Sequence, residues 1–124
     1  EIRSAKELTV YKRAYQLAMA IFETSQNLPC GGTVLPDKPD PEIIPIHLLN
    51  LREAWAKRRY EAHFLAKLTD CDGENAETDT SLDFAHSCGY VSPPQHAKLT
   101  AMSHEVGKML GAMLNAPDKF LLKL

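Results

Sequence analysis

The stretch Asn50-Leu51-Arg52-Glu53-Ala54-Trp55-Ala56-Lys57-Arg58-Arg59, close to the middle of the chain, decides the fold. Leu51 and Trp55 stand four residues apart, and this spacing places them on one face of a helix together with Leu48. A second line of side chains runs through Ile46, Leu49, Glu53, Ala56 and Tyr60. We therefore predict a helix over residues 45–57. Neither glycine nor proline separates it from the next helix, so the boundary stays open between residues 56 and 60.

Before this stretch, apolar residues at steps of three and four predict a helix over residues 4–27. The stripe consists of Leu8, Tyr11, Ala14, Ala18, Ile21 and Phe22, widened by Tyr15 and Leu17. Ser4 and Glu7 are spaced as a capping box at its start. Residues 28–41 contain four prolines and two glycines and predict a long loop, interpreted as an ordered crossover or as a segment that docks on a neighbouring subunit.

After the central stretch, the helical step continues over residues 59–88. The stripe comprises Phe64, Leu65, Leu68, Cys71, Thr78, Leu82 and Ala85. Residues 70–75 (Asp-Cys-Asp-Gly-Glu-Asn) resemble a turn, because Asp, Asn and Gly compete with helix formation. Gly73 costs a helix about 1 kcal/mol relative to alanine, an amount that tertiary packing can outweigh. Local signals thus leave two alternatives, one long helix or two shorter ones, with Gly89 as the stop.

The last helix is predicted over residues 94–115, with an apolar stripe that consists of Leu99, Met102, Val106, Met109, Leu110, Met113 and Leu114. Gly107 and Gly111 share a face, which permits close approach of another backbone. The apolar tail at residues 120–124 is expected to pack on its own bundle or on a partner. No segment alternates as a strand does. We predict an all-α fold, an up-and-down antiparallel four-helix bundle, as a single domain over residues 1–124.

The amino-acid composition excludes several classes of function. The 124 residues include 14 basic and 16 acidic side chains, a formal net charge of −2, so no global charge drives binding to nucleic acid. No apolar run approaches the ~20 residues that cross a bilayer, and the N-terminus does not resemble a signal peptide. Three widely spaced cysteines (Cys30, Cys71, Cys88) favour reduced thiols and a cytoplasmic protein. Cys71 and Cys88 are expected to face the bundle.

Motifs of catalysis and of metal or cofactor binding are missing from the sequence. There is no Glu-x-x-His pair, no His-Glu-x-x-His, and no phosphate-binding loop around Gly31-Gly32. Gly73 falls at position four of a calcium-loop pattern that requires glycine at position six. We therefore expect no enzymatic activity, no catalytic residue, no cofactor, no metal, no membrane contact and no small-molecule substrate.

The basic cluster, which consists of Arg52, Lys57, Arg58 and Arg59, is the candidate contact surface, and Lys67 could extend it. Cations at the end of a helix complement its dipole, so the cluster can be purely structural. The alternative is contact with the phosphates of a nucleic acid, RNA in particular, or with another protein.

Four segments resemble one bacterial family of four-helix-bundle proteins, which includes those encoded in 23S ribosomal RNA intervening sequences and, more distantly, the accessory variability determinants of diversity-generating retroelements. The central stretch resembles the family's Asn-Ile-Ala-Glu-Gly-aromatic-x-Arg-Arg signature through Asn50, Glu53, Trp55, Lys57 and Arg58. The remaining segments that resemble family motifs are Leu8-Thr9-Val10-Tyr11 with Ala14, Glu77-Thr78 with Leu82, Ala85 and Gly89-Tyr90, and Glu105-Val106-Gly107-Lys108-Met109-Leu110.

The resemblance implies that the third helix continues through Gly73 and that the chain assembles with itself as a homopentamer. It implies packing and hydrogen-bonding roles for Asn50, Glu53 and Trp55. The chain departs from the family where Leu48 replaces a proline and where Arg52 and Ala54 replace small residues of the signature. The expected function is a homopentameric, non-enzymatic scaffold or interaction module in the cytoplasm. The alternative is an RNA-binding accessory protein that uses the basic cluster.

Overall fold

The computed structural model of the protein describes residues 2–26 and 46–122. These ranges contain four α-helices and no β-strand: α1 (Thr9–Gln26), α2 (Ile46–Ala56), α3 (Glu61–Ser87) and α4 (Pro93–Asn115). Two short 3-10 turns, η1 (Ala5–Glu7) and η2 (Pro117–Lys119), lie at the two ends. The loop expected at 28–41 lies outside the described residues.

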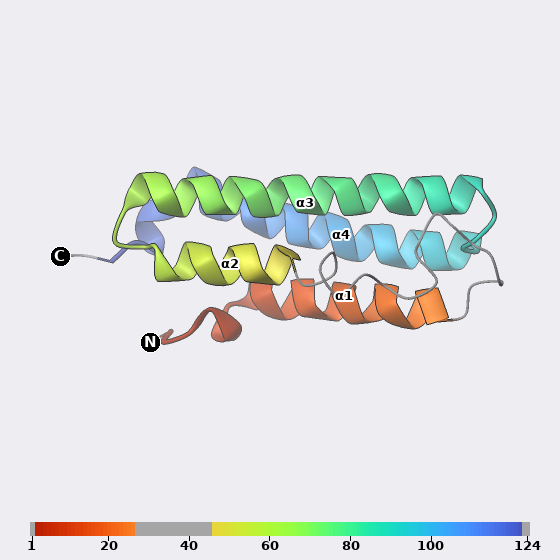
Figure 1. The fold of residues 1–124 in the computed structure, drawn as a ribbon, viewed down its shortest axis with the longest axis horizontal. Helices are drawn as coiled ribbons and strands as arrows, with labels where there is room; N and C mark the ends of the chain where they lie inside the picture. Colours follow the sequence, from red (N-terminus) through yellow and green to blue (C-terminus); the bar gives the residue numbers. More distant parts are fainter. Residues whose placement is uncertain (1, 27–45, 123–124) are drawn as a thin grey trace.

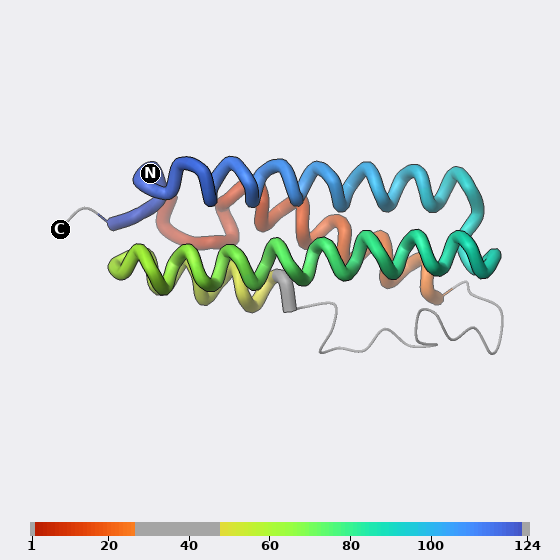
Figure 2. The backbone as a smooth tube through the Cα atoms, turned by 90° about the horizontal axis from the view of Figure 1, so that it is seen from above, coloured from red at the N-terminus to blue at the C-terminus, as the bar shows by residue number. Residues whose placement is uncertain are grey.

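The four helices run alternately up and down along one long axis (Figure 1). α3 packs against α2 and α4, and α1 packs against α4 and, less extensively, α2. α2 is much shorter than α3 and lies beside only its first half (Figure 2). Because the helices alternate in direction, the α2–α3 turn lies at the same end of the bundle as both ends of the chain (Figure 1).

The core lies between the four helices and is built from the stripes that the sequence indicates. Phe64, Leu68, Val106 and Leu110 have an exposed fraction of 0%, and Leu51 has one of 1%. On α2 the line through Leu51 and Trp55 faces this core, whereas Leu49 and Tyr60 of the second line are exposed. Within the described ranges, no helix combines the length and apolar character needed to cross a membrane.

The first helix begins later than expected, at Thr9 instead of Ser4. Ser4 and Glu7 do form a capping box, but it closes the short turn η1. Leu8 follows in an extended conformation (φ −67°, ψ 137°) and is 4% exposed, so its burial in the core separates η1 from α1. The prediction of one continuous helix from Ser4 was wrong because the cap serves a turn that the buried Leu8 ends.

α3 is a single helix that continues through Gly73, so the turn alternative for residues 70–75 was wrong. A Cβ atom added at Gly73 would meet no atom within 4 Å. The helix is held by the packing of Leu68, Cys71 and Leu82, each with an exposed fraction of 0%. Gly89 ends the segment with φ of +78°, the left-handed conformation that favours glycine after a helix.

A buried polar pair joins α3 to α4. Asn75 Nδ2 donates to the main-chain oxygen of Ser103 at 2.9 Å, and the Ser103 hydroxyl donates to Asn75 Oδ1 at 3.4 Å. Both residues are buried, at 6% and 0% exposure. Gly107 leaves room for the pair, because a Cβ there would lie 3.3 Å from Asn75 Nδ2. Gly107 thus allows the close helix approach that the sequence indicated.

Candidate functional site

The turn between α2 and α3 contains most of the basic cluster. Arg58 covers the ring of Trp55, with its guanidinium carbon 3.6 Å from the ring centroid, and its Nε donates to the Trp55 main-chain oxygen at 2.8 Å. Burial lowers the pKa of Arg58. The main-chain N–H of Leu122 donates to the Arg58 oxygen at 3.3 Å, which ties the chain's last described segment to this turn. Arg58 therefore has a structural role and is poorly placed to contact a partner.

The rest of the basic cluster is accessible. Arg52 and Arg59 are exposed and Lys57 is half-buried, and none of the three forms an ion pair within the described part of the chain. Lys67 does not extend this surface, because its Nζ lies 3.2 Å from Glu53 Oε2 and 4.0 Å from Asp70 Oδ2. Three cations of the basic cluster, Arg52 on α2 and Lys57 and Arg59 in the turn, thus remain available.

The three signature residues occupy different environments. Trp55 is 9% exposed and packs in the core, and its indole Nε1 has no hydrogen-bond partner among the described residues. Asn50 is half-buried. Glu53 is exposed and forms its ion pair with Lys67 of α3, so it links two helices from the surface.

An apolar ridge follows the outer side of α1. Tyr15, Met19 and Phe22, at steps of four and three, are 52%, 42% and 40% exposed. Tyr15 and Phe22 belong to the apolar stripe predicted to face the core, and for these two residues the prediction was wrong. Ala14 and Leu17 of the same stripe are buried, together with Val10, which the predicted stripe left out. The angular width of the apolar stripe on α1 could have indicated this exposure. A stripe that covers more than the ~100° needed for one contact indicates a second contact surface. We call these three side chains the α1 ridge.

A groove of about 370 Å³ lies between α3 and α4. One wall is formed by residues of α3 (Asp72, Asn75, Ala76 and Asp79) and the other by residues of α4 (Ser103, His104, Gly107 and Lys108). Asp79 Oδ1 lies 3.2 Å from His104 Nε2, so the walls approach each other at that point. We call this feature the α3/α4 groove.

The α3 wall of this groove belongs to an acidic segment. Residues 70–83 hold six carboxylates and neither lysine nor arginine. Within this segment, burial and then the nearby charges of Glu77 and Asp70 raise the pKa of Glu74. The carboxylates of α3 therefore repel one another, and a cationic partner would relieve that repulsion.

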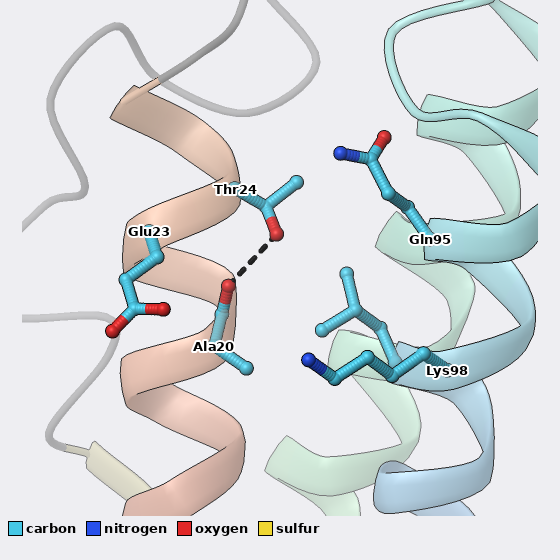
Figure 3. A pocket seen from close by; sticks show the side chains of 6 residues that line it. Ala20, Glu23, Thr24, Gln95 and Lys98 are labelled. Atoms are coloured by element: carbon cyan, nitrogen blue, oxygen red, sulfur yellow. Dashed lines mark hydrogen bonds between the residues drawn. The ribbon is translucent and has the colours of Figure 1, made fainter.

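A smaller pocket, of about 230 Å³, lies where the last turns of α1 meet the first turns of α4 (Figure 3). Gln95 and Lys98 extend from α4 toward Ala20 and Thr24 of α1 (Figure 3). The Thr24 hydroxyl donates to the Ala20 main-chain oxygen at 2.8 Å, so it already has a partner. The lining offers no set of convergent groups that defines a ligand.

His86, His96, Cys71 and Cys88 line neither the groove nor the smaller pocket. His96 Nε2 and Asp83 Oδ1 are 2.8 Å apart, and His86 stacks on His96 with ring centroids 4.4 Å apart. Among the described residues, no three His, Cys, Asp or Glu side chains are placed to hold one metal ion. Cys71 is buried as expected, but Cys88 is exposed, because it lies beyond the last turn of α3.

These observations define a helical-bundle protein whose candidate sites lie on its surface. A family model described as 23S rRNA-intervening sequence protein matches residues 48–112, more than half of the chain. The chain belongs to this family. The match includes the central stretch and most of α2, α3 and α4.

One solved structure supports the fold. It is a protein with unknown function from the S23 ribosomal protein family of Bacteroides thetaiotaomicron VPI-5482. The two chains share 21% identity, the likeness covers 86% of this chain and 96% of that one, and the TM-score is 0.70. A search of curated proteins found no match.

Proposed function

We propose that this chain is a non-enzymatic, cytoplasmic scaffold or interaction module that assembles with itself as a homopentamer. The α1 ridge carries the proposal. Tyr15, Met19 and Phe22 expose large apolar surfaces in a row, at a spacing that covers about 10 Å of helix. Other exposed apolar side chains, such as Phe84 and Leu49, lie on other helices.

Exposure of the α1 ridge to water costs free energy that a contact recovers. Burial of apolar surface contributes roughly 25 cal/mol per Å², so three large side chains supply a strong local driving force. Aromatic and methionine side chains are also enriched at protein–protein interfaces. A second copy of this chain is the partner that is always present. The stoichiometry of five comes from the family resemblance.

The test combines light scattering with a variant that makes the α1 ridge polar, Met19→Glu/Phe22→Glu. We expect the wild type to scatter as an oligomer and this variant as a single chain. Phe84→Glu is the matched control, because Phe84 is 60% exposed on α3 and stands apart from the ridge. The proposal is rejected if the wild type is monomeric at micromolar concentration, or if the ridge variant keeps the wild-type mass.

A second candidate function is RNA binding through the basic cluster. The supporting observation is that Arg52 of α2 and Lys57 and Arg59 of the α2–α3 turn form no ion pair in the described ranges. An oligomer would repeat this surface once per copy, which increases affinity through multivalency. The net charge of −2 restricts such binding to a local contact.

The RNA test compares two double variants of equal charge across a salt series. Arg52→Ala/Arg59→Ala removes two exposed cations of the basic cluster, whereas Lys6→Ala/Lys98→Ala removes exposed cations from η1 and α4. Each lost phosphate contact lowers the slope of log affinity against log salt by about 0.7–0.9. We expect this loss only for the first variant. Equal slopes for both variants, or no binding by the wild type at low salt, would reject this function.

A further inference from the structure

We propose that the contact between copies is heterologous: the α1 ridge of one copy inserts into the α3/α4 groove of the next copy. This inference rests on the proposed self-association and names the surface that receives the ridge. It divides the interface into two different patches on every chain.

The α1 ridge and the α3/α4 groove have complementary shapes. The α1 ridge presents three large side chains, whereas the lining of the α3/α4 groove includes the small residues Ala76 and Gly107. The groove has a volume of about 370 Å³, and Ala76, His104 and Lys108 of its lining are exposed, so side chains can enter it from outside, except where Asp79 and His104 meet. α1 packs against α4 and α2 in its own chain, and the residues of the groove include none from α1. The ridge of the same chain therefore does not fill the groove.

The α3 side of the groove and the residues that precede the α1 ridge carry opposite charges. The α3 wall of the groove lies within residues 70–83, which hold six carboxylates and no lysine or arginine. Residues 2–13, before the start of the α1 ridge, hold four cations and one carboxylate, and one of the cations, Arg13, is paired with Glu105 of the same chain. Lys12 is exposed one turn before Tyr15, so it would approach Asp72 or Asp79 when the ridge enters the groove. Opposite charges on the two patches favour a ridge in a groove over two ridges face to face.

The kind of contact determines the symmetry of the assembly. An isologous contact joins a patch to a copy of itself and closes as a dimer, whereas two different patches join copies head to tail. Head-to-tail contacts form a ring when the rotation between copies closes. A ridge-in-groove contact is thus compatible with a ring of five copies, which a ridge-to-ridge contact alone is not.

A mixing experiment tests this geometry. The ridge variant Met19→Glu/Phe22→Glu keeps an intact groove, and a groove variant, Ala76→Arg, keeps an intact ridge. We expect each variant alone to have the mass of one chain. Mixed in equal amounts, they can form one intact contact, so we expect a 1:1 heterodimer by native mass spectrometry. A ridge-to-ridge contact predicts no heterodimer and normal assembly of Ala76→Arg.

Ala62→Arg is the matched control, because Ala62 and Ala76 are both exposed alanines of α3 and only Ala76 lines the groove. We expect this control to assemble as the wild type does. If Ala76→Arg keeps the wild-type mass while the ridge variant is monomeric, the α3/α4 groove is not the receiving surface, although the scaffold function stands. A monomeric wild type rejects both proposals.

A charge exchange tests the same contact without filling the groove. We expect Lys12→Glu to weaken assembly about two- to fivefold, the range of exposed ion pairs, and Lys12→Glu/Asp72→Lys to recover it. Circular dichroism at equal concentration verifies that each variant remains helical. Equal assembly of Lys12→Glu and the wild type at low salt, or no recovery in the double variant, would overturn the proposed pairing of these patches.

Discussion

Asn75 Nδ2 of α3 donates a hydrogen bond of 2.9 Å to the main-chain oxygen of Ser103 in α4, at a position where both residues are buried. This bond fixes the alignment of α3 and α4 along their common axis. A shift of one helix by one turn would leave the buried Asn75 amide without a hydrogen-bond partner. Unpaired buried polar groups cost about 1–3 kcal/mol, so the pair favours one alignment strongly over its neighbours.

Removal of this amide is the first prediction. Asn75→Ala leaves the buried Ser103 hydroxyl without its partner, and we expect the free energy of unfolding to fall by about 1–3 kcal/mol in urea titrations. Thr80→Ala is the control, because Thr80 is exposed on the same helix, and its effect should stay within about 0.5 kcal/mol. Equal stability of the two variants would show that the pair does not stabilise the bundle.

The second prediction separates two neighbouring arginines. Arg58→Ala removes the contact with the Trp55 ring, and we expect a loss of about 1 kcal/mol of unfolding free energy. Arg59 is exposed and has no ion pair in the described ranges, so Arg59→Ala should change stability by less than about 0.5 kcal/mol. Trp55 is the single tryptophan of the chain, so its fluorescence should change only in the Arg58 variant. The prediction fails if both variants leave the spectrum unchanged.

The third prediction concerns two glutamates with opposite pKa shifts. Main-chain N–H groups of Arg3 and Ser4 donate to Glu7, which lowers the pKa of that carboxyl below 4.5. Burial and then the Glu77 charge raise the pKa of Glu74 above 4.5. A carbon-detected NMR titration should therefore show that Glu7 protonates at lower pH than Glu74. The reverse order would contradict the assigned contacts.

These shifts have opposite consequences for stability. The ionised form of Glu7 is stabilised by folding, so its contribution is present above pH 4.5 and is lost as pH falls through its lowered pKa. The ionised form of Glu74 is destabilised by folding, so Glu74→Gln should raise the unfolding free energy at pH 7 and not near pH 3. Added salt should reduce the gain at pH 7, because it screens the repulsion from Glu77.

Cysteine reactivity provides the fourth prediction. Burial, followed by the charges of Asp72 and Glu74, raises the pKa of Cys71 to about 12, whereas Cys88 is exposed. In a Cys30→Ser background, iodoacetamide at pH 8 should label Cys88 in the native protein and Cys71 only after unfolding. The unfolded thiol ionises near 9.0, so the contribution of Cys71 to stability should be present below pH 9 and lost as pH rises toward 12. Native labelling of both thiols at one rate would contradict this burial.

Much of the fold could be predicted from the sequence because helical periodicity is a local property. The core-facing residues of α3 and α4, the Gly89 stop and the burial of Trp55 follow from spacing and from the family resemblance. The start of α1 could not be predicted in this way, since a capping box has the same sequence signature on a 3-10 turn as on a long helix. Continuity through Gly73 depended on the resemblance, because the competing turn signal is equally local.

The candidate surfaces were harder to predict because they depend on which helix faces are left uncovered. The role of Arg58 required the position of the Trp55 ring, and the loss of Lys67 from the basic cluster required the approach of Glu53. Tyr15 and Phe22 of the α1 ridge belong to the broad apolar stripe of the first helix, and spacing alone does not show which residues of that stripe are exposed. The α3/α4 groove combines residues about 30 positions apart, a separation at which spacing carries no information.

The proposed function requires self-association, and the mass of the wild-type chain in solution is the decisive measurement. We predict that light scattering at micromolar concentration gives about 69 kDa, five times the 13.8 kDa of one chain. We also expect the wild-type mass to fall on dilution, whereas Met19→Glu/Phe22→Glu should have the mass of one chain at every concentration. A mass of 13.8 kDa throughout the dilution series would contradict the account.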